Sequence, residues 1–304
     1  MKQAFKNTVA AFLLALVAFF TAFSPAISPA REVTDETGRK VRIAPFPQRI
    51  VSLAPGITET LYALELEDNI AGVTTFCDWP KHAKDKEKVG GFTNPSIEKI
   101  VSLNPDLILA TADGNRKDTV YKLERLGLPV YVINPSDSRG IMESILRIGE
   151  ITDRRQQADA LTTDLQKRLN YIAGQTKSKN KPRVFFQLGL EPVISAGAGT
   201  LINEAIEMAG GVNIARLSAT RYPRYSAEGI MAGKPDIILF APMTGNKELA
   251  AVKNLWKKID EIPAIKNGRI YPIDIDLISR ASPRIVDAIE QMALIFHPEI
   301  KIGK

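Results

Sequence analysis

The sequence predicts an α/β protein made of two Rossmann-like lobes, each with a mostly parallel sheet, joined by one long helix. Apolar segments typical of buried strands alternate with amphipathic helical segments, as in a parallel sheet covered on both faces. One phrase, a Ser-x-Glu helix start followed by Pro-Asp and an apolar strand, occurs at 96–110 and again at 226–240. A long helical pattern lies between the two copies. We expect a leader at 1–30, an N-terminal lobe at 31–137, linker helices at 138–176 and a C-terminal lobe at 177–304.

The first thirty residues have the pattern of a cleavable signal peptide. Lys2 and Lys6 form a positive start, Val9–Phe23 is a nearly unbroken apolar run, and the small residues Ser28 and Ala30 suit a signal peptidase. About fifteen apolar residues are few for a membrane span, which needs roughly twenty. No cysteine lies at the end of this run, so no lipid anchor is expected. We expect an exported, soluble, periplasmic protein.

The charge and the cysteine content argue against a nucleic-acid-binding protein and against a protein stabilised by disulfides. The formal net charge is +6, and removal of Lys2 and Lys6, the only charged residues of the leader, leaves +4. No dense Lys/Arg block is present, so no nucleic-acid partner is expected. Cys77 is the single cysteine, so the exported chain has no internal disulfide and depends on packing for its stability.

The first lobe is expected to begin with an edge hairpin within 31–48. A strand at 49–53 follows, and Thr58 is the expected N-cap of a helix that runs through Leu64. The remaining expected strands of this lobe are 70–74, 107–110 and 130–133.

Each copy of the repeated phrase predicts a helix, a turn and a buried strand. Ser96 and Ser226 are expected N-caps, and Glu98 and Glu228 place an acid in the first helical turn. Two such units imply two lobes that face each other across a cleft, with the glutamates at equivalent places. The alternative is that a helix, Pro-Asp and a strand are simply common in α/β proteins.

The segment from 141 to 172 keeps apolar residues at helical spacing, and its second helix is expected at 153–173. At 1.5 Å per residue that helix is on the order of 30 Å long, which suits a strut between two lobes. Gly174 is expected near its end. The second half then repeats the α/β series, with strands expected at 183–187, 237–240 and 270–273, a helix through Met208 and a last helix at 283–295.

Few side chains in the chain could carry catalysis or hold a metal. The two histidines, His82 and His297, have no metal-ligating neighbour at helical spacing and are expected at the surface. The loop at Gly197 lacks the lysine and the spacing of a phosphate-binding loop. Cys77 is expected to be a buried or half-buried thiol rather than a nucleophile. The sequence therefore speaks against an enzyme and against a bound cofactor.

Aromatic, proline and charged residues gather where the predicted strands end. In open α/β sheets the carboxyl ends of the strands are where ligands bind. Aromatic faces with a few polar groups suit a large, flat, partly polar ligand between two lobes. Phe76 and Trp79 could each be core residues instead. The segments concerned are Pro55, Phe76–Pro80, Phe92, Arg221–Tyr225 and Asp276–Arg280.

Over 48–297 the chain resembles the periplasmic substrate-binding proteins of ABC importers for vitamin B12, and more widely their siderophore- and haem-binding relatives. The Arg280 motif and the Phe76–Pro80 loop favour the cobalamin branch. The resemblance is carried by Arg49-Ile-Val-Ser-Leu-Ala-Pro55 with Thr58-Glu59, Asp78-Trp79-Pro80, Ile97-Glu98-Lys-Ile100 with Asn104-Pro105-Asp106, Arg183-Val-Phe-Phe-Gln-Leu-Gly189, Gly210-Gly-Val-Asn-Ile214 and Arg280-Ala-Ser-Pro-Arg284.

The resemblance implies a class III periplasmic binding protein, a monomer whose lobes move little when ligand binds. It implies that a corrinoid lies in the cleft and that Glu98 and Glu228 dock onto arginines of a permease dimer driven by cytoplasmic ATPases. The implied ligand contacts are Pro55, Phe76, Phe92, Tyr222, Asp276, Leu277, Ile278, Ser279 and Arg280.

Some positions depart from the cobalamin pattern. Phe76, Phe92 and Tyr222 stand where the cobalamin binders tend to carry Tyr or Trp, and Thr111 stands where a further Trp is expected. A siderophore or haem is the alternative ligand, with Arg221, Arg224 and Arg280 available for acidic groups.

Overall fold

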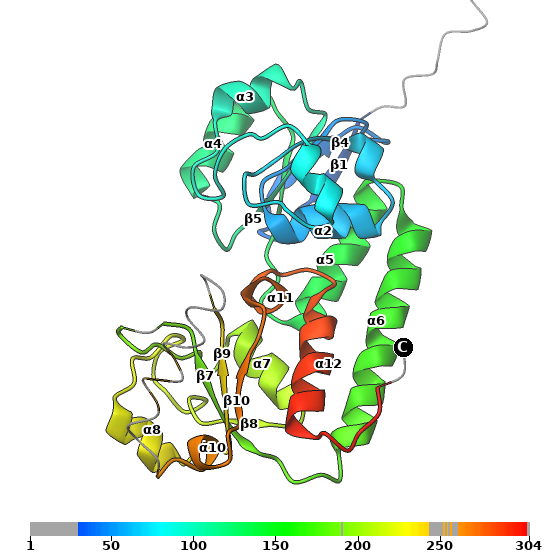
Figure 1. Ribbon diagram of the computed structural model, residues 1–304. Coiled ribbons are helices and arrows are strands. Elements are labelled where there is room, and N and C mark those ends of the chain that lie inside the picture. Colours follow the sequence, from blue (N-terminus) through cyan, green and yellow to red (C-terminus); the bar gives the residue numbers. More distant parts are fainter. Residues whose placement is uncertain are drawn as a thin grey trace, which may run out of the picture.

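The computed structural model describes residues 30–302 except 190, 243–251, 253, 255 and 257–260. It confirms the predicted α/β architecture of two lobes, one above the other in Figure 1, with linker helices along one side. The predicted signal peptide lies outside the described residues.

The N-terminal lobe is built on a parallel sheet of order β4-β3-β5-β6, with a separate antiparallel hairpin of β1 and β2. The strands are β1 Arg31–Thr34, β2 Lys40–Ile43, β3 Ile50–Ser52, β4 Ile70–Val73, β5 Leu107–Thr111 and β6 Val130–Ile133. The helices are α2 Pro55–Ala63, α3 Ile97–Ser102 and α4 Lys117–Arg125, with short 3₁₀ turns at Glu67–Asn69 and Lys81–Asp85.

The C-terminal lobe repeats the plan with a parallel sheet of order β10-β9-β7-β8. Its strands are β7 Arg183–Gln187, β8 Val212–Asn213, β9 Ile237–Phe240 and β10 Ile270–Pro272. Its helices are α7 Leu201–Met208, α8 Ala227–Gly233, α10 Pro263–Lys266, α11 Ile275–Ser279 and α12 Ile285–Phe296.

Two helices link the lobes, α5 Ser138–Ile151 and α6 Arg155–Thr176. In Figure 1 α6 runs beside both lobes and leads into β7, as the strut interpretation predicted. The helix begins two residues later than expected because Asp153 adopts a left-handed conformation, with φ 59°, that interrupts the turns. It continues past Gly174 to Thr176.

Helix α2 differs from the prediction at its start. It begins at Pro55, whose fixed φ and missing N–H suit the first helical position, so Thr58 lies inside the helix rather than at its N-cap. The Thr58 hydroxyl instead lies 2.8 Å from that of Ser52 and donates to Cys77 Sγ at 3.1 Å. Cys77 is accordingly a buried thiol within the N-terminal lobe, as expected.

The repeated phrase has the same local structure in both lobes. Ser96 Oγ accepts from the N–H of the third helical residue of α3, and Ser226 Oγ does so in α8, each at 3.2 Å. Both N-cap predictions are confirmed. The carboxylates of Asp106 and Asp236 accept the backbone N–H groups of Arg49, just before β3, and Arg183, the first residue of β7. The arginines in turn donate to the last turn of each helix, at Leu103 O and Gly233 O.

One hydrophobic core runs through both lobes. On β5, Leu107 and Leu109 belong to this core, while Ile108 and Ala110 belong to a smaller cluster under α3 and α4. On β9, Ile237 and Leu239 belong to the same shared core, while Ile238 and Phe240 join a cluster with Trp256. The alternation follows from the two-residue period of a strand. Side chains of α5, α6, α7 and α12 join the core residues of the two sheets into one cluster.

His82 is exposed and stacks edge-on against Tyr62, as a surface histidine was expected to be. The surface prediction for His297 is wrong: the side chain is 3% exposed. It follows α12 and packs against Gly210, whose missing side chain makes room for the ring. Proximity to the chain terminus therefore did not indicate exposure.

The backbones of the two lobes come into direct contact at Gly56. A Cβ on this residue would overlap the carbonyl oxygen of Ala281, in the segment between α11 and α12. We predict that Gly56→Ala destabilises the protein by about 1–3 kcal/mol in denaturant unfolding, because the lobes must separate to admit the methyl group.

Gly174→Ala is the matched control, because Gly174 lies in α6 with open space around it. It should stabilise the protein by up to about 1 kcal/mol through its helix propensity. Equal effects of the two substitutions would contradict a tight contact between the lobes at Gly56.

Candidate functional site: the cleft between the lobes

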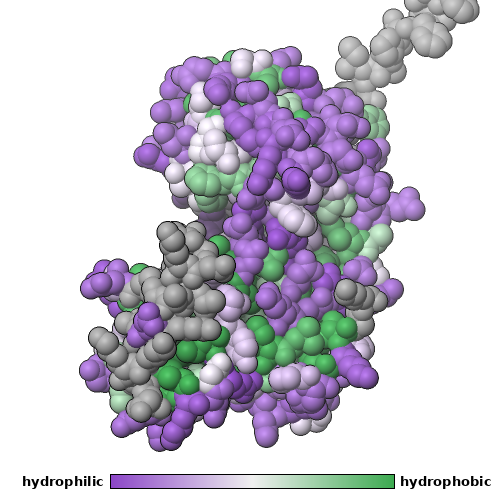
Figure 2. All heavy atoms as spheres, viewed as in Figure 1, coloured by the Kyte–Doolittle hydropathy of each residue, from purple (hydrophilic) through white to green (hydrophobic). Residues whose placement is uncertain are grey.

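A cleft of about 570 Å³ lies between the two lobes, and residues of both line it. Figure 2 shows the surface hollowed between the upper and lower lobes. The loops that follow β3, β4, β5 and β6 supply one wall, and the loops around α7 and α11 supply much of the other. The carboxyl ends of the strands in both parallel sheets thus point toward the same space.

Most of the ligand contacts expected from the sequence line this cleft. Leu277 does not line it; this residue is partly buried and packs against the shared core. Because α11 is a helix, Leu277 faces away while its neighbours face the cleft. The lining positions are Pro55, Phe76 and Phe92 from the N-terminal lobe and Tyr222, Asp276, Ile278, Ser279 and Arg280 from the C-terminal lobe.

Aromatic side chains lie on both walls of the cleft. Phe76 is 59% exposed and Tyr222 is 54% exposed, so both rings are accessible to a ligand in the cleft. Phe92 is partly buried, and its ring lies against Gly114, where a Cβ would overlap it. The walls can therefore stack on a flat ligand from opposite sides.

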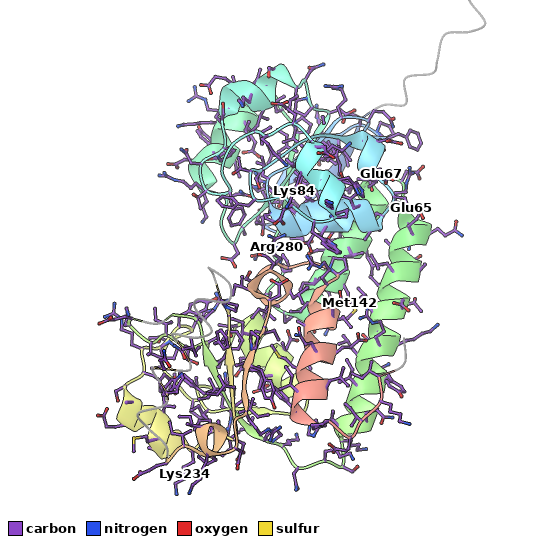
Figure 3. The ribbon with its side chains drawn as sticks, in the orientation of Figure 1. Glu65, Glu67, Lys84, Met142, Lys234 and Arg280 are labelled. Carbon is purple, nitrogen blue, oxygen red and sulfur yellow. The ribbon has the colours of Figure 1, made fainter. Side chains whose placement is uncertain are left out.

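Arg280 occupies the junction of the lobes, where Figure 3 labels it, and three carboxylates surround it. Its Nη1 donates to Glu59 Oε1 at 2.9 Å and to Asp78 Oδ1 at 2.8 Å, both in the N-terminal lobe. Its Nη2 lies 2.7 Å from Asp276 Oδ2. Burial opposes the guanidinium charge, but the bonds with Asp78 and Glu59 and the charge of Asp276 outweigh it and raise the pKa of Arg280.

Glu59 is the centre of this network and was not predicted from the sequence. The side chain is 2% exposed, and it also accepts from Ser282 Oγ at 2.7 Å and Arg284 Nη1 at 3.2 Å. The Arg284 guanidinium in turn stacks on Trp79, 4.3 Å from the ring centroid. The signal that could have found Glu59 is an acid among apolar residues of α2, which needs a buried positive partner.

Asn115 is a second residue that the sequence analysis missed. It is 5% exposed and connects three loops at the upper wall of the cleft. Its Nδ2 donates to Leu53 O at 3.0 Å and Phe92 O at 2.8 Å, and its Oδ1 accepts from Thr111 N at 2.8 Å. The amide thereby fixes Phe92 relative to the ends of β3 and β5.

The charges of the cleft are balanced. Among the lining residues, Asp113 and Asp276 are acidic and Arg221 and Arg280 are basic. The Arg221 guanidinium lies 5.9 Å from the Tyr222 ring centroid. In the part of the chain that the structure describes, no group of three or more His, Cys, Asp or Glu side chains is arranged to hold a metal ion.

Glu98 and Glu228 lie outside the cleft, at the exposed starts of α3 and α8. In Figure 1 these helices lie at the far ends of the upper and lower lobes. Each carboxylate bonds its own backbone N–H and the hydroxyl of the N-cap serine, Ser96 or Ser226, and these bonds lower both pKa values. The Ser96 Oγ to Glu98 Oε2 distance is 2.9 Å. Both side chains are therefore fixed, charged and accessible at neutral pH.

Comparison with known proteins agrees with this geometry. The family model for periplasmic binding proteins matches residues 50–277. The chain belongs to the periplasmic binding protein family. This is a family of solute-binding proteins rather than enzymes, in agreement with the sequence analysis.

Two relatives of this periplasmic binding protein are named differently, one for vitamin B12 and one as an ABC transporter substrate-binding lipoprotein. It is 31% identical to the vitamin B12-binding protein of Vibrio cholerae over 82% of this chain and 89% of that protein. It is 33% identical to the ABC transporter substrate-binding lipoprotein YvrC of Bacillus subtilis over 88% of this chain and 85% of that protein.

Solved structures show the same fold. The B12-binding protein BtuF of V. cholerae matches with a TM-score of 0.73 at 30% identity, over 83% of this chain and 97% of that chain. A periplasmic haem-binding protein of Pseudomonas aeruginosa matches with a TM-score of 0.76 at 25% identity, over 85% of this chain and 96% of that chain. In the part of this binding protein that the structure describes, no helix is both long and apolar enough to cross a membrane.

We predict that Asn115→Asp weakens both stability and ligand binding. At neutral pH the new carboxylate faces the carbonyls of Leu53 and Phe92 with no hydrogen to donate, which should cost about 1–3 kcal/mol in denaturant unfolding.

The pH dependence of this loss tests its cause. Burial raises the pKa of the new carboxyl group above its unfolded value, so the loss should be smallest near about pH 4 and grow as pH rises. Asn267→Asp, at an exposed position after α10, is the control and should show little loss. A loss of stability independent of pH would contradict the role of the Asn115 amide as a donor.

Proposed function

We propose that this protein captures a corrinoid, vitamin B12, in the cleft between its lobes and delivers it to the permease dimer of an ABC importer with cytoplasmic ATPases. The observation that supports this most is the pairing of exposed aromatic rings on both walls with an arginine already neutralised by acids. A corrinoid is a large flat ring with amide side chains, so it needs stacking surfaces and neutral hydrogen-bonding groups. The likeness to the V. cholerae B12-binding protein supports the same ligand.

The charge balance of the cleft favours a corrinoid over the alternative ligands. Haem and many siderophores carry carboxylates, and recognition of a carboxylate favours an arginine free to form two parallel bonds. Arg280 already bonds three carboxylates, and among the described lining residues Arg221 is the other guanidinium. Arg224 is exposed in the same segment and does not line the cleft. Ser279 and Thr93 offer hydroxyls that suit ligand amides.

The protein is proposed to act as an exported monomer released in the periplasm. The leader pattern of residues 1–30 supports export. YvrC is named a lipoprotein, but the one cysteine of the printed sequence, Cys77, is buried between α2 and the loop after β4. That thiol is therefore not placed to carry a lipid anchor.

Glu98 and Glu228 are proposed to dock the loaded protein on the permease. They occupy equivalent helix starts on the two lobes, they are exposed, and their serine caps hold the carboxylates in place. Two matched acids suit a partner made of two similar subunits, because each lobe can present one acid to one subunit.

Calorimetric titration of the mature protein tests the ligand. Cyanocobalamin should bind with micromolar or lower Kd, while haemin and a ferric siderophore should bind at least about tenfold more weakly. Absence of heat and of a spectral change at high micromolar cyanocobalamin would exclude a B12 carrier. Tighter binding of haemin would favour the alternative.

The docking role predicts a separation of two measurements. Combined Glu98→Ala and Glu228→Ala substitutions should leave the cyanocobalamin Kd unchanged, because neither side chain lines the cleft. Binding to permease reconstituted in nanodiscs should weaken by about tenfold or more, mainly through slower association. Glu143→Ala, on the exposed face of α5, is the control and should change neither. Loss of ligand affinity in the double variant would contradict the docking assignment.

A further inference from the structure

The buried Glu59 side chain lies beside the cleft, and neither the resemblance nor the comparisons explain it. It comes from α2 of the N-terminal lobe and bonds Arg280, Ser282 and Arg284, all of the C-terminal lobe. A carboxylate that is 2% exposed is costly unless it is fully paired, and here three donors pair it. These contacts hold Glu59 and Arg280 in one arrangement across the lobe boundary.

The charges of this cluster do not cancel. Glu59, Asp78 and Asp276 surround Arg280, and Glu59 is shared with Arg284. Asp274 also lies 4.0 Å from Arg284 Nη2, so four carboxylates on two guanidinium groups leave a net charge of −2 beside the cleft. Arg280 nevertheless lines the cleft, and its bonds with the three acids leave its Nε–H and one Nη2–H without a partner among the described residues. Arg280 can thus donate to a ligand without offering a free positive charge.

We propose that Glu59 is a specificity-determining residue, whose carboxylate cancels the charge of Arg280 so that the cleft accepts amide side chains of a ligand and rejects carboxylates. A neutral carbonyl can accept the remaining N–H groups of Arg280. A ligand carboxylate at the same place meets the field of Glu59, Asp78 and Asp276 at short range. This inference rests on the proposed function for the identity of the ligand, but it concerns the charge that the cleft selects.

A pair of corrinoids that differ mainly in peripheral charge tests the proposal. Dicyanocobinamide carries its side chains as amides, and dicyanocobyrinic acid carries them as free carboxylates. The wild-type protein should prefer the amide form by at least about a hundredfold in Kd. Glu59→Gln keeps the size of the side chain and removes its charge, and it should narrow that preference by about tenfold. If Glu59 had a merely structural role, Glu59→Gln would weaken the binding of both ligands equally and leave the ratio of their Kd values unchanged.

Two further variants make the test robust. Asp78 is 43% exposed, so Asp78→Asn removes an acid from Arg280 without disturbing a buried site and should narrow the preference about threefold. Glu290→Gln makes the same chemical change at a half-buried arginine pair, with Arg168 between α6 and α12, and should leave the preference unchanged. If Glu59→Gln does not fold, the Asp78→Asn result decides.

The outcomes separate this inference from the proposed function. If the wild-type protein binds corrinoids, and Glu59→Gln and Asp78→Asn both keep the wild-type preference for the amide form, the role of Glu59 is overturned. The proposed function is then unaffected. A wild-type protein that binds no corrinoid overturns the proposed ligand, and the same comparison is then made with haemin and its neutral dimethyl ester. Preference of the wild-type protein for the carboxylate form of either pair overturns the inference.

Discussion

The shared hydrophobic core is the constraint on which the rest of the molecule depends. One face of each sheet and the helices α5, α6, α7 and α12 pack as one cluster, so the lobes are not independent bodies on a flexible joint. Any large opening of the cleft would expose part of that core to water, at roughly 25 cal/mol per Å² of apolar surface. The walls of the cleft are therefore held near a fixed separation before any ligand arrives, which lowers the entropic cost of binding.

Directional hydrogen bonds at the lobe boundary supplement the shared hydrophobic core. On one side Glu59 reaches from α2 to Arg280 and Ser282. On the other side Glu204 of α7 accepts from the backbone N–H and the hydroxyl of Ser138, at the first turn of α5. A hydrophobic core alone permits small sliding, whereas these bonds are lost when donor and acceptor move by about 1 Å. The two glutamates thus fix the relative position of the surfaces that line the cleft.

The sequence predicted those parts of the fold that local rules determine. The repeated phrase identified two equivalent helix-turn-strand units because N-caps, Pro-Asp turns and buried strands depend on a few adjacent residues. Helix ends were less predictable: α2 begins at Pro55, which suits the first helical position, and Thr58 lies inside the helix, where its hydroxyl bonds Cys77 from another loop. The aromatic residues at strand ends could be assigned to the cleft because sheet topology brings them together. Glu59 and Asn115 could not, because their partners lie in other loops or in the other lobe.

The charged residues of the cleft differ from those at the exposed starts of α3 and α8 in what their charges face. Glu98 and Glu228, at the exposed starts of α3 and α8, keep their charges facing water, which suits the proposed docking role because exposed charges steer association at little cost. In the cleft, Glu59 and Arg280 pair with each other, so Arg280 presents hydrogen-bond donors beside the aromatic surface without a free positive charge. Tight binding of a neutral ligand requires such a surface, since a free buried charge would have to be desolvated without a counter-charge on the ligand. The same residue type therefore has opposite consequences at the two places, and burial, rather than the identity of the side chain, decides which one applies.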